Sequence, residues 1–204
     1  MERSASYRSK LLEVPVDGEF RFKCTRCGAC CSGGPNVSLT VFDVVRMAKF
    51  LKMHWRDFLR GYVKVIVADV LPFMALRGDD RGRCLLLYEK HDGTTECTVY
   101  PARPMRCRLY PVLVEDLGGQ RVYLDTKSSG VGRGSGRPLP RRLVSQYIGE
   151  RRRHYQLLYK LVVEEGVDPL EALERAIEEA WRESEECSEG CWSDLDYLDS
   201  LGEV

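Results

Sequence analysis

The sequence predicts an α+β fold: a small cysteine-cluster core with β-hairpins and a helical insert, followed by a C-terminal helical segment. Short alternating or β-branched runs, separated by turn residues, recur up to residue 125. Apolar residues recur at helical spacing between 40 and 62 and again beyond 140. Because 44% of the 204 residues are apolar, the chain can bury an ordinary core, and we do not expect its nine cysteines to act as disulfide staples.

The first predicted elements lead into a cysteine-rich turn and out of it. Residues 20–23 alternate in polarity and predict a short strand that ends at Cys24. Thr40 and Asp43 match the pattern of a capping box, and the apolar residues after them predict a helix over 40–52. A second, shorter helix is expected around 55–62, and together the two helices form the predicted helical insert.

Strands and a hairpin are predicted after this insert. Segments 63–70 and 71–76 are β-branched or apolar enough to form strands. Residues 85–88 predict a buried strand, and the Asp-Gly pair at 92–93 predicts a hairpin turn that leads back to Cys97. The hairpin therefore carries one cysteine at each of its two ends.

A second hairpin and a loop are expected next. Gly118-Gly119 separates two strand-like runs at 112–115 and 121–125. The glycine-rich residues 127–140 predict a loop that ends the compact core.

The rest of the chain is predicted to be helical. Helical spacing predicts a long helix over 140–165, and Asp168 followed by Pro169 opens another. We therefore divide the chain into an N-terminal arm (1–19), a cysteine-cluster metal-binding domain (20–137), C-terminal helices that pack on the core (138–186) and an acidic tail with Cys187 and Cys191 (187–204).

The formal net charge is zero, yet the charges are distributed unevenly. Residues 164–204 hold 15 acidic and two basic side chains, so the rest of the chain carries an excess of 13 positive charges. The favoured interpretation is that the acidic segment packs against the basic body, and a basic surface for a partner is the alternative. No apolar stretch approaches the roughly 20 residues that cross a bilayer, and no N-terminal apolar run suggests secretion, so we expect a cytoplasmic protein.

Seven cysteines form the constellation that carries the chemistry. Four stand within eight residues and three arrive from later segments: Cys24, Cys27, Cys30, Cys31, Cys84, Cys97 and Cys107. A Cys-x-x-Cys spacing suits chelation because both sulfurs can face one ion, and Gly28 permits the tight bend. Side chains of neighbouring residues tend to diverge, so we expect that Cys30 and Cys31 do not bind one metal in the same way and that one serves a second site.

These motifs resemble a known family, the cysteine-cluster proteins named for Cys-x-x-Cys-x-x-Cys-Cys and described as zinc- or iron-chelating domains. The segment from Cys97 through Tyr100, Arg103 and Pro104 to Cys107 is similar to the second signature of the family, and the resemblance spans residues 20–137. It implies a metal centre held by the seven cysteines. A flagellin lysine methylase shares the cysteine motif, but this chain shows no separate methyltransferase signature, so we do not transfer that activity.

The chain departs from the pattern of the family at one position. Many relatives place a further cysteine ahead of the glycine-rich loop, where residues 128–134 here contain serine instead. Cys187 and Cys191 lie outside the region of resemblance, and we hypothesise that one of them completes the site. The alternative is that the pair is free or forms a disulfide.

The identity of the metal stays open between zinc and an iron-sulfur cluster, because thiolate ligands suit both. Cys-x-x-Cys-x-x-Cys with a remote cysteine is the ferredoxin arrangement, whereas structural zinc sites usually show two separate knuckles, so the spacing favours iron-sulfur, of the 4Fe-4S type. We expect Arg103, Tyr100, Arg106 and Arg26 to surround the ligands and offset their negative charge, unless the arginines face solvent and Tyr100 only fills the core.

Two weaker signals lie outside the cysteine motifs. Gly132, Arg133 and Gly134 could form an anion-binding loop, although a flexible turn is the favoured interpretation. None of the three histidines stands at ligand spacing to a cysteine, so we expect them on the surface or within helices.

The sequence supports three hypotheses about function. The first is a metal-cluster protein with a redox or metal-centre role that serves a protein redox or substrate partner. The second is a zinc-stabilised module that contacts nucleic acid or a protein, although nucleic acid is the less favoured partner. The third is a cluster-dependent modifying enzyme, which requires an open coordination position.

Overall fold

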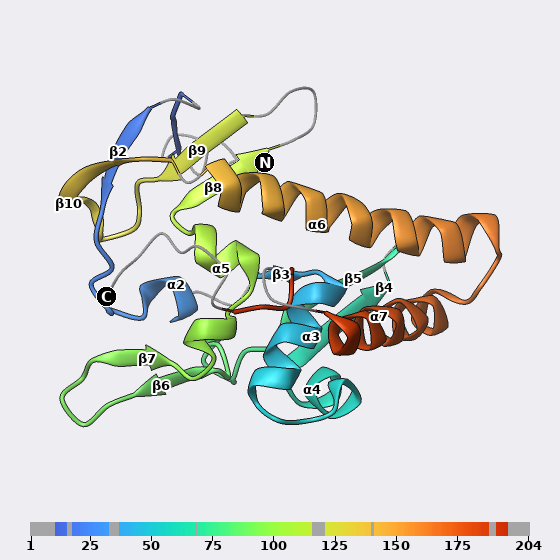
Figure 1. Ribbon diagram of the computed structural model, residues 1–204. Coiled ribbons are helices and arrows are strands. Elements are labelled where there is room, and N and C mark those ends of the chain that lie inside the picture. The colour runs from blue at the N-terminus through green and yellow to red at the C-terminus, as the bar shows by residue number, and fades with distance from the viewer. Residues whose placement is uncertain are drawn as a thin grey trace.

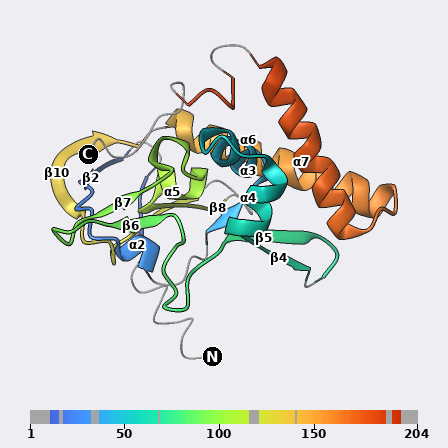
Figure 2. The same ribbon diagram turned by 90° about the horizontal axis from the view of Figure 1, so that it is seen from below.

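The structure, a computed structural model, confirms the α+β class (Figure 1). It describes residues 11–15, 18–32, 37–67, 69–115, 121–139, 141–187 and 191–195. Within these ranges the strands form small antiparallel sheets, and helices cover one side of the molecule. Figures 1 and 2 place the β2–β10 pair and helix α7 at opposite ends of the fold.

The helical insert begins where the sequence predicts it. Helices α3 (Val41–Phe50) and α4 (Trp55–Tyr62) match the two expected helices. The Thr40 hydroxyl accepts a hydrogen bond from the Asp43 N–H at 3.2 Å, and an Asp43 carboxylate oxygen accepts from the Thr40 N–H at 3.0 Å. This capping box satisfies two backbone donors that the first helical turn would otherwise leave unpaired.

The sheet that follows the insert is a three-stranded one in the order β3 (Ser38–Leu39), β5 (Pro72–Leu76) and β4 (Val63–Val67). Both long strands were predicted, with slightly wider bounds. Met74 and Leu76 turn their side chains into the core beneath α3.

The next hairpin consists of β6 (Leu87–Glu89) and β7 (Thr95–Cys97) and confirms the prediction of a hairpin here. The prediction that its first strand is buried is wrong. Of the segment predicted to be buried, Leu86 is covered, whereas Leu85 and Tyr88 are 40% and 52% exposed. The hairpin projects from the body in Figure 1, so only its base reaches the core.

A second three-stranded sheet has the order β1 (Leu11–Glu13), β9 (Arg121–Asp125) and β8 (Val112–Glu115). The β8–β9 hairpin is as predicted, although its predicted glycine turn lies outside the described residues. The 3-10 turn η1 (Tyr100–Ala102) and the short helix α5 (Met105–Leu109) connect β7 to this sheet.

The prediction of a loop over 127–140 is wrong for most of its length. Residues Val131–Pro138 form strand β10, which pairs antiparallel with β2 (Glu19–Phe22) through an irregular register. A Cβ atom on Gly130 would lie 2.3 Å from the Lys23 carbonyl oxygen. Glycine at position 130, directly before the strand, thus allows the two backbones to approach closely, whereas Gly132 and Gly134 lie in the irregular stretch between Val131 and Gly136.

The C-terminal helices are α6 (Arg141–Tyr159) and α7 (Pro169–Glu186), joined through the π-helical turn η2 (Lys160–Glu164). The Asp168 carboxylate caps α7 by accepting a hydrogen bond from the Leu170 N–H at 2.9 Å. Among the described helices, none is both long enough and apolar enough to span a bilayer.

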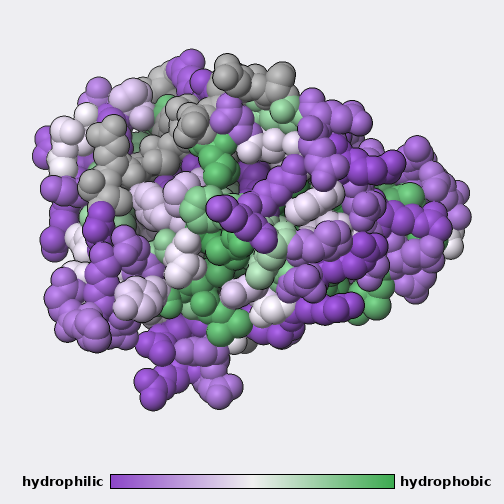
Figure 3. Space-filling view, turned by 60° about the horizontal axis from the view of Figure 1, so that its bottom comes forward, coloured by the Kyte–Doolittle hydropathy of each residue, from purple (hydrophilic) through white to green (hydrophobic). Residues whose placement is uncertain are grey.

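Part of the charge asymmetry is used within the molecule. Glu183 of α7 pairs with Arg153 of α6, and Glu178 of α7 lies 3.6 Å from Arg56 of α4. This confirms for α7 the expectation that acidic residues pack against the basic body. Figure 3 shows one face covered mainly by hydrophilic side chains, with hydrophobic ones gathered in a central band.

The apolar core consists of two clusters. The first lies among α3, α4, α7 and the β3–β5–β4 sheet, and the partly buried Cys84 and Cys97 pack against it. The second lies among α5, α6, β2 and the β1–β9–β8 sheet, and Cys24 packs against it. The cysteine-bearing segments therefore lie where the two clusters meet.

Candidate metal centre

The cysteine-rich turn is held in place by the β6–β7 hairpin. Gly28 has a φ of +67°, and a Cβ atom there would lie 2.9 Å from the Thr95 hydroxyl. The Thr95 N–H donates to the Arg26 carbonyl at 3.2 Å, which ties the turn to β7. The one-turn helix α2 (Ala29–Ser32) follows at once and carries Cys30 and Cys31. Glycine at position 28 is therefore required both for the conformation and for the space.

Three later segments bring their cysteines to α2. The Cys84 N–H donates to the Cys31 carbonyl at 2.8 Å, so the backbone itself fixes this cysteine beside the turn. Cys97 ends β7 opposite Leu87, and Cys107 lies in α5. Electrostatic interactions connect these thiols with one another. We call this set the five-cysteine group: Cys30, Cys31, Cys84, Cys97 and Cys107.

Within the five-cysteine group, Cys30 and Cys31 form a coupled pair. Their sulfur atoms are 3.7 Å apart. The hydrogen bond from the Cys31 thiol lowers the pKa of Cys30 to about 7, and the nearby Arg103 guanidinium contributes. The same hydrogen bond raises the pKa of Cys31, as does its burial. The expectation that the two neighbouring side chains diverge is therefore wrong for this structure, because their sulfur atoms approach within hydrogen-bond distance.

Burial raises the pKa of Cys84, Cys97 and, most strongly, Cys107. Nearby thiolates raise these pKa values further, because several negative charges would have to share one poorly hydrated region. A bound cation removes this penalty, and thiolates prefer the softer metals such as zinc and iron. The donor set therefore fits a thiolate-bound metal centre.

The remaining two cysteines of the first motif lie beside this group. Cys27 is exposed, and the Ser129 hydroxyl lies 3.3 Å from its sulfur. Hydrogen bonds from Ser129 and Thr25 lower the pKa of Cys27. Cys24 packs against the second apolar cluster. The loop in which relatives were expected to carry a further cysteine thus brings a serine directly to Cys27.

The ligands are gathered but not arranged around a single point. Among the described residues, no three His, Cys, Asp or Glu side chains are placed so that they could hold one metal ion together. The structure thus supports convergence of the five cysteines, and a metal would have to draw their side chains together.

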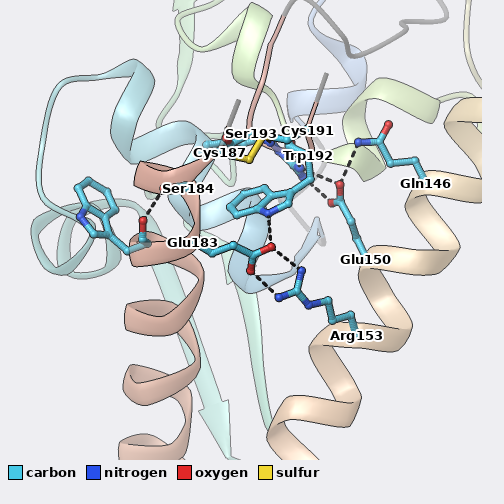
Figure 4. The surroundings of a disulfide bond; sticks show 11 residues. Gln146, Glu150, Arg153, Glu183, Ser184, Cys187, Cys191, Trp192 and Ser193 are labelled. Atoms are coloured by element: carbon cyan, nitrogen blue, oxygen red, sulfur yellow. Dashed lines mark hydrogen bonds and ion pairs between the residues drawn. A yellow bond between two sulfur atoms is a disulfide. The ribbon is translucent and has the colours of Figure 1, made fainter. Parts of the chain in front are cut away.

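Cys187 and Cys191 are joined in a disulfide, with 6.1 Å between their Cα atoms (Figure 4). Sequence reasoning had left both a ligand role and a disulfide open. A disulfide offers no thiolate to a metal, so the structure does not support the hypothesis that one of these residues completes the site.

Arg103 is the arginine whose position best matches the expectation that it offsets the negative charge of the thiolates. It is buried, its guanidinium lies 3.8 Å from the centre of the Tyr100 ring, and it donates to the Tyr100 carbonyl at 2.7 Å. Its charge lowers the pKa of both Cys30 and Cys97. Tyr100 therefore orients Arg103 by its ring and its carbonyl.

The other arginines of the two motifs lie elsewhere. Arg26 is exposed and its charge acts on Glu96, while Arg106 is half-buried in α5. Arg108 is buried and donates to the Arg103 carbonyl at 3.2 Å, and burial together with Arg103 lowers its pKa to about 10. The predicted anion-binding residues Gly132, Arg133 and Gly134 are exposed in the irregular part of β10.

Sequence reasoning missed a buried charge network behind the five-cysteine group. The Arg46 side chain is fully buried and lies 2.7 Å from both Asp43 and Glu150. Asp43 also accepts a hydrogen bond from the Met105 N–H at 2.9 Å, at the start of the helix that carries Cys107. The signal in the sequence was an arginine on the apolar side of a predicted helix, three residues after a capping aspartate.

The fold and this gathering of thiols define the class: a cysteine-cluster protein of the metal-chelating type. The family model described as "Putative zinc- or iron-chelating domain" (CxxCxxCC) matches residues 23–127, just over half of the chain. The chain belongs to this family, as its two cysteine motifs had indicated.

One curated relative is an uncharacterized protein of Methanocaldococcus jannaschii, MJ0661. It is 29% identical over 168 residues, which cover 78% of this chain and 82% of the relative. The match thus extends beyond the cysteine-cluster region into the C-terminal helices or the N-terminal arm. No solved structure matches the chain.

Proposed function

We propose that the chain is an iron-sulfur protein that exchanges electrons with a protein partner. The observation that carries the proposal is the ferredoxin-like spacing of Cys24, Cys27 and Cys30 together with remote cysteines that the fold brings beside Cys30 and Cys31. A 4Fe-4S cluster and a single zinc ion each take four thiolates, so the number of thiols fits both and the spacing favours the cluster. A bound cluster of this kind supplies a site that takes up and releases single electrons.

The surroundings of the thiols support this role. Arg103 brings one positive charge to the side of Cys30 and Cys97 and offsets part of the negative charge of the ligands. Charge and hydrogen bonds near the sulfurs set the reduction potential of a cluster. Cys27, which is exposed, marks the side of the centre that a partner can approach.

The proposal includes a reducing setting such as the cytoplasm. All seven cysteines predicted as ligands are free thiols in the structure. Glutathione and thioredoxin systems keep such thiols reduced and able to bind metal.

Anaerobic purification, elemental analysis and visible spectroscopy test the proposal. We expect stoichiometric iron and sulfide, and a brown protein whose visible absorption bleaches on reduction with dithionite. A colourless protein with stoichiometric zinc would refute the cluster and the electron-transfer role while leaving metal binding intact. A protein that retains neither metal would refute metal binding as well.

Two matched substitutions locate the centre. We expect Cys107→Ser to lose most of the bound metal, because Cys107 is half-buried in α5 and interacts electrostatically with Cys97, Cys30 and Cys84. The Cys187→Ser/Cys191→Ser variant removes two sulfurs outside the group and, in the absence of a competing chelator, should keep the wild-type metal content. Equal losses in both variants would contradict the assignment of ligands.

A single zinc ion is the second candidate, and one distance favours it. With zinc-sulfur bonds of about 2.3 Å, two ligands of a tetrahedral site lie about 3.8 Å apart. The sulfur atoms of Cys30 and Cys31 are 3.7 Å apart, so this pair could form one edge of such a site. In that case the metal stabilises the fold, and the protein acts as a binding module. Salt-dependent binding of RNA by the zinc-loaded protein would support this role.

A further inference from the structure

The described segment 191–195, which we call the Trp192 segment, is seated on helices α3 and α7 (Figure 4). The Trp192 ring meets Phe42 of α3 edge to face, with 4.9 Å between ring centres. Its indole N–H donates to Glu183 of α7 at 3.0 Å, and its carbonyl accepts from Arg46 of α3 at 3.1 Å. Leu195 packs against both apolar clusters. The segment therefore covers the buried charge network.

The Cys187–Cys191 disulfide joins the end of α7 to the first residue of the Trp192 segment. Cys187 follows the last residue of α7, and Cys191 precedes Trp192. The Ser193 N–H lies 3.3 Å from the Cys191 sulfur, and the Asp194 N–H donates to the Cys191 carbonyl at 3.2 Å. The bond thus holds the start of the Trp192 segment beside the C-terminal end of α7.

A chain of contacts leads from the Trp192 segment to the five-cysteine group. Arg46 contacts the Trp192 carbonyl, Asp43 pairs with Arg46, and the Met105 N–H donates to Asp43. Met105 begins α5, which carries Cys107, and the charge of Asp43 acts on that thiol. The Trp192 segment is thereby connected to the placement of Cys107 through two side chains.

We propose that the Cys187–Cys191 disulfide is a redox latch that keeps the Trp192 segment seated and thereby regulates metal retention at the five-cysteine group. A dithiol reductant opens it: the sulfur-sulfur bond takes up two electrons and two protons to give two thiols, and the dithiol becomes a disulfide. The opened segment leaves Arg46 and Glu183, and α5 loses part of its support. The regulatory part rests on the proposed metal centre, whereas the opening of the latch does not.

The length of the loop that the disulfide closes sets how strongly the bond favours the seated over the released segment. The two cysteines are four positions apart in sequence. Closing a loop of about five residues favours the closed state about 30-fold by the chain-entropy relation. Reduction should therefore shift the balance between the seated and released segment about 30-fold towards release.

The state of the latch can be measured in metal-free, full-length protein by thiol alkylation and amide hydrogen exchange. We expect seven alkylated cysteines and one disulfide in protein purified without reductant. A phosphine reductant should speed exchange across 191–195 about 30-fold, and the Cys187→Ser/Cys191→Ser variant should show the fast rate with or without reductant. Nine alkylated cysteines before reduction, or exchange that reduction does not change, would overturn the latch.

Metal retention tests the regulation separately. Wild-type protein and the double serine variant are loaded equally, without reductant, and challenged with excess EDTA. We expect the variant to lose metal at least about fivefold faster, the lower range of a typical coupling between sites. Equal rates in protein whose segment is shown to be released would overturn the regulation. Failure of the wild-type protein to load metal would instead refute the proposed function, while the exchange result still decides the latch.

Discussion

The substitution Arg46→Met tests the buried charge network between α3 and α6. In the native protein the guanidinium has no exposure, and two carboxylates lie 2.7 Å from it. Burial opposes its charge, but Glu150 and Asp43 outweigh that effect and raise the pKa of Arg46 above its usual range. Methionine fills a similar volume, so the change removes the charge and the hydrogen bonds rather than the packing.

The expected loss of stability is large. Removing one partner of a buried ion pair costs about 3–5 kcal/mol, because the remaining charges stay buried without compensation. Two carboxylates would remain here, exposed by 2% and 8%, so we expect the upper half of that range, about 4–5 kcal/mol. A domain of ordinary stability has about 5–15 kcal/mol in total.

Urea denaturation of metal-free protein, followed by circular dichroism, measures this loss. Arg56→Met provides the matched control, because the Arg56 side chain is 47% exposed and pairs with exposed carboxylates of α7. We expect that variant to lose at most about 1 kcal/mol. A loss below about 1 kcal/mol for Arg46→Met would refute the argument, since it would mean that water already compensates these charges.

Two further predictions concern β10 and α6. Gly130→Ala should lower the free energy of unfolding by about 1–3 kcal/mol, because the new Cβ atom would lie 2.3 Å from the Lys23 carbonyl oxygen. Gly149→Ala is the control, because a Cβ atom there meets nothing within 4 Å, and it should be neutral or stabilising. Equal effects of the two substitutions would contradict the β2–β10 pairing. Burial, aided by Arg151 and opposed by Asp43, lowers the pKa of His154 to about 4. The unfolded chain therefore binds a proton that the folded one does not, and stability should fall from about pH 6.5 to pH 4 by up to about 3 kcal/mol. Denaturation of His154→Gln across this range should lack that decline, and an unchanged slope would exclude His154 as its source.

Local signals predicted much of the fold. The capping box of Thr40 and Asp43, the Asp92-Gly93 turn and the Asp168 cap each satisfy backbone groups within a few residues, so neighbours in sequence were enough to place them. Strand β10 was missed because it pairs with β2, a segment far away in the sequence, and a glycine-rich run carries no local signal of that pairing.

The sequence predicted which cysteines form the candidate site, but not the contacts that hold them in place. The two cysteine motifs contain four members of the five-cysteine group, since thiols at chelating spacing are a strong chemical signal, and the fifth, Cys84, was predicted from the hairpin that follows it. The role of Asp43 as a support for Met105 depends on a contact across 62 positions, and that of Glu150 on one across 104. Such long-range pairs leave no periodic trace in a single sequence.

The position of the cysteines between two apolar clusters has a consequence for how the protein unfolds. Cys84 and Cys97 pack on the first cluster, while Cys24 packs on the second, which also holds the Met105 and Leu109 side chains on either side of Cys107. A metal bound by these thiols would join the two clusters into one cooperative unit. Without it, the clusters are joined by the Arg46–Glu150 ion pair and by Leu195, so bound metal should add to the cooperativity with which the two clusters unfold.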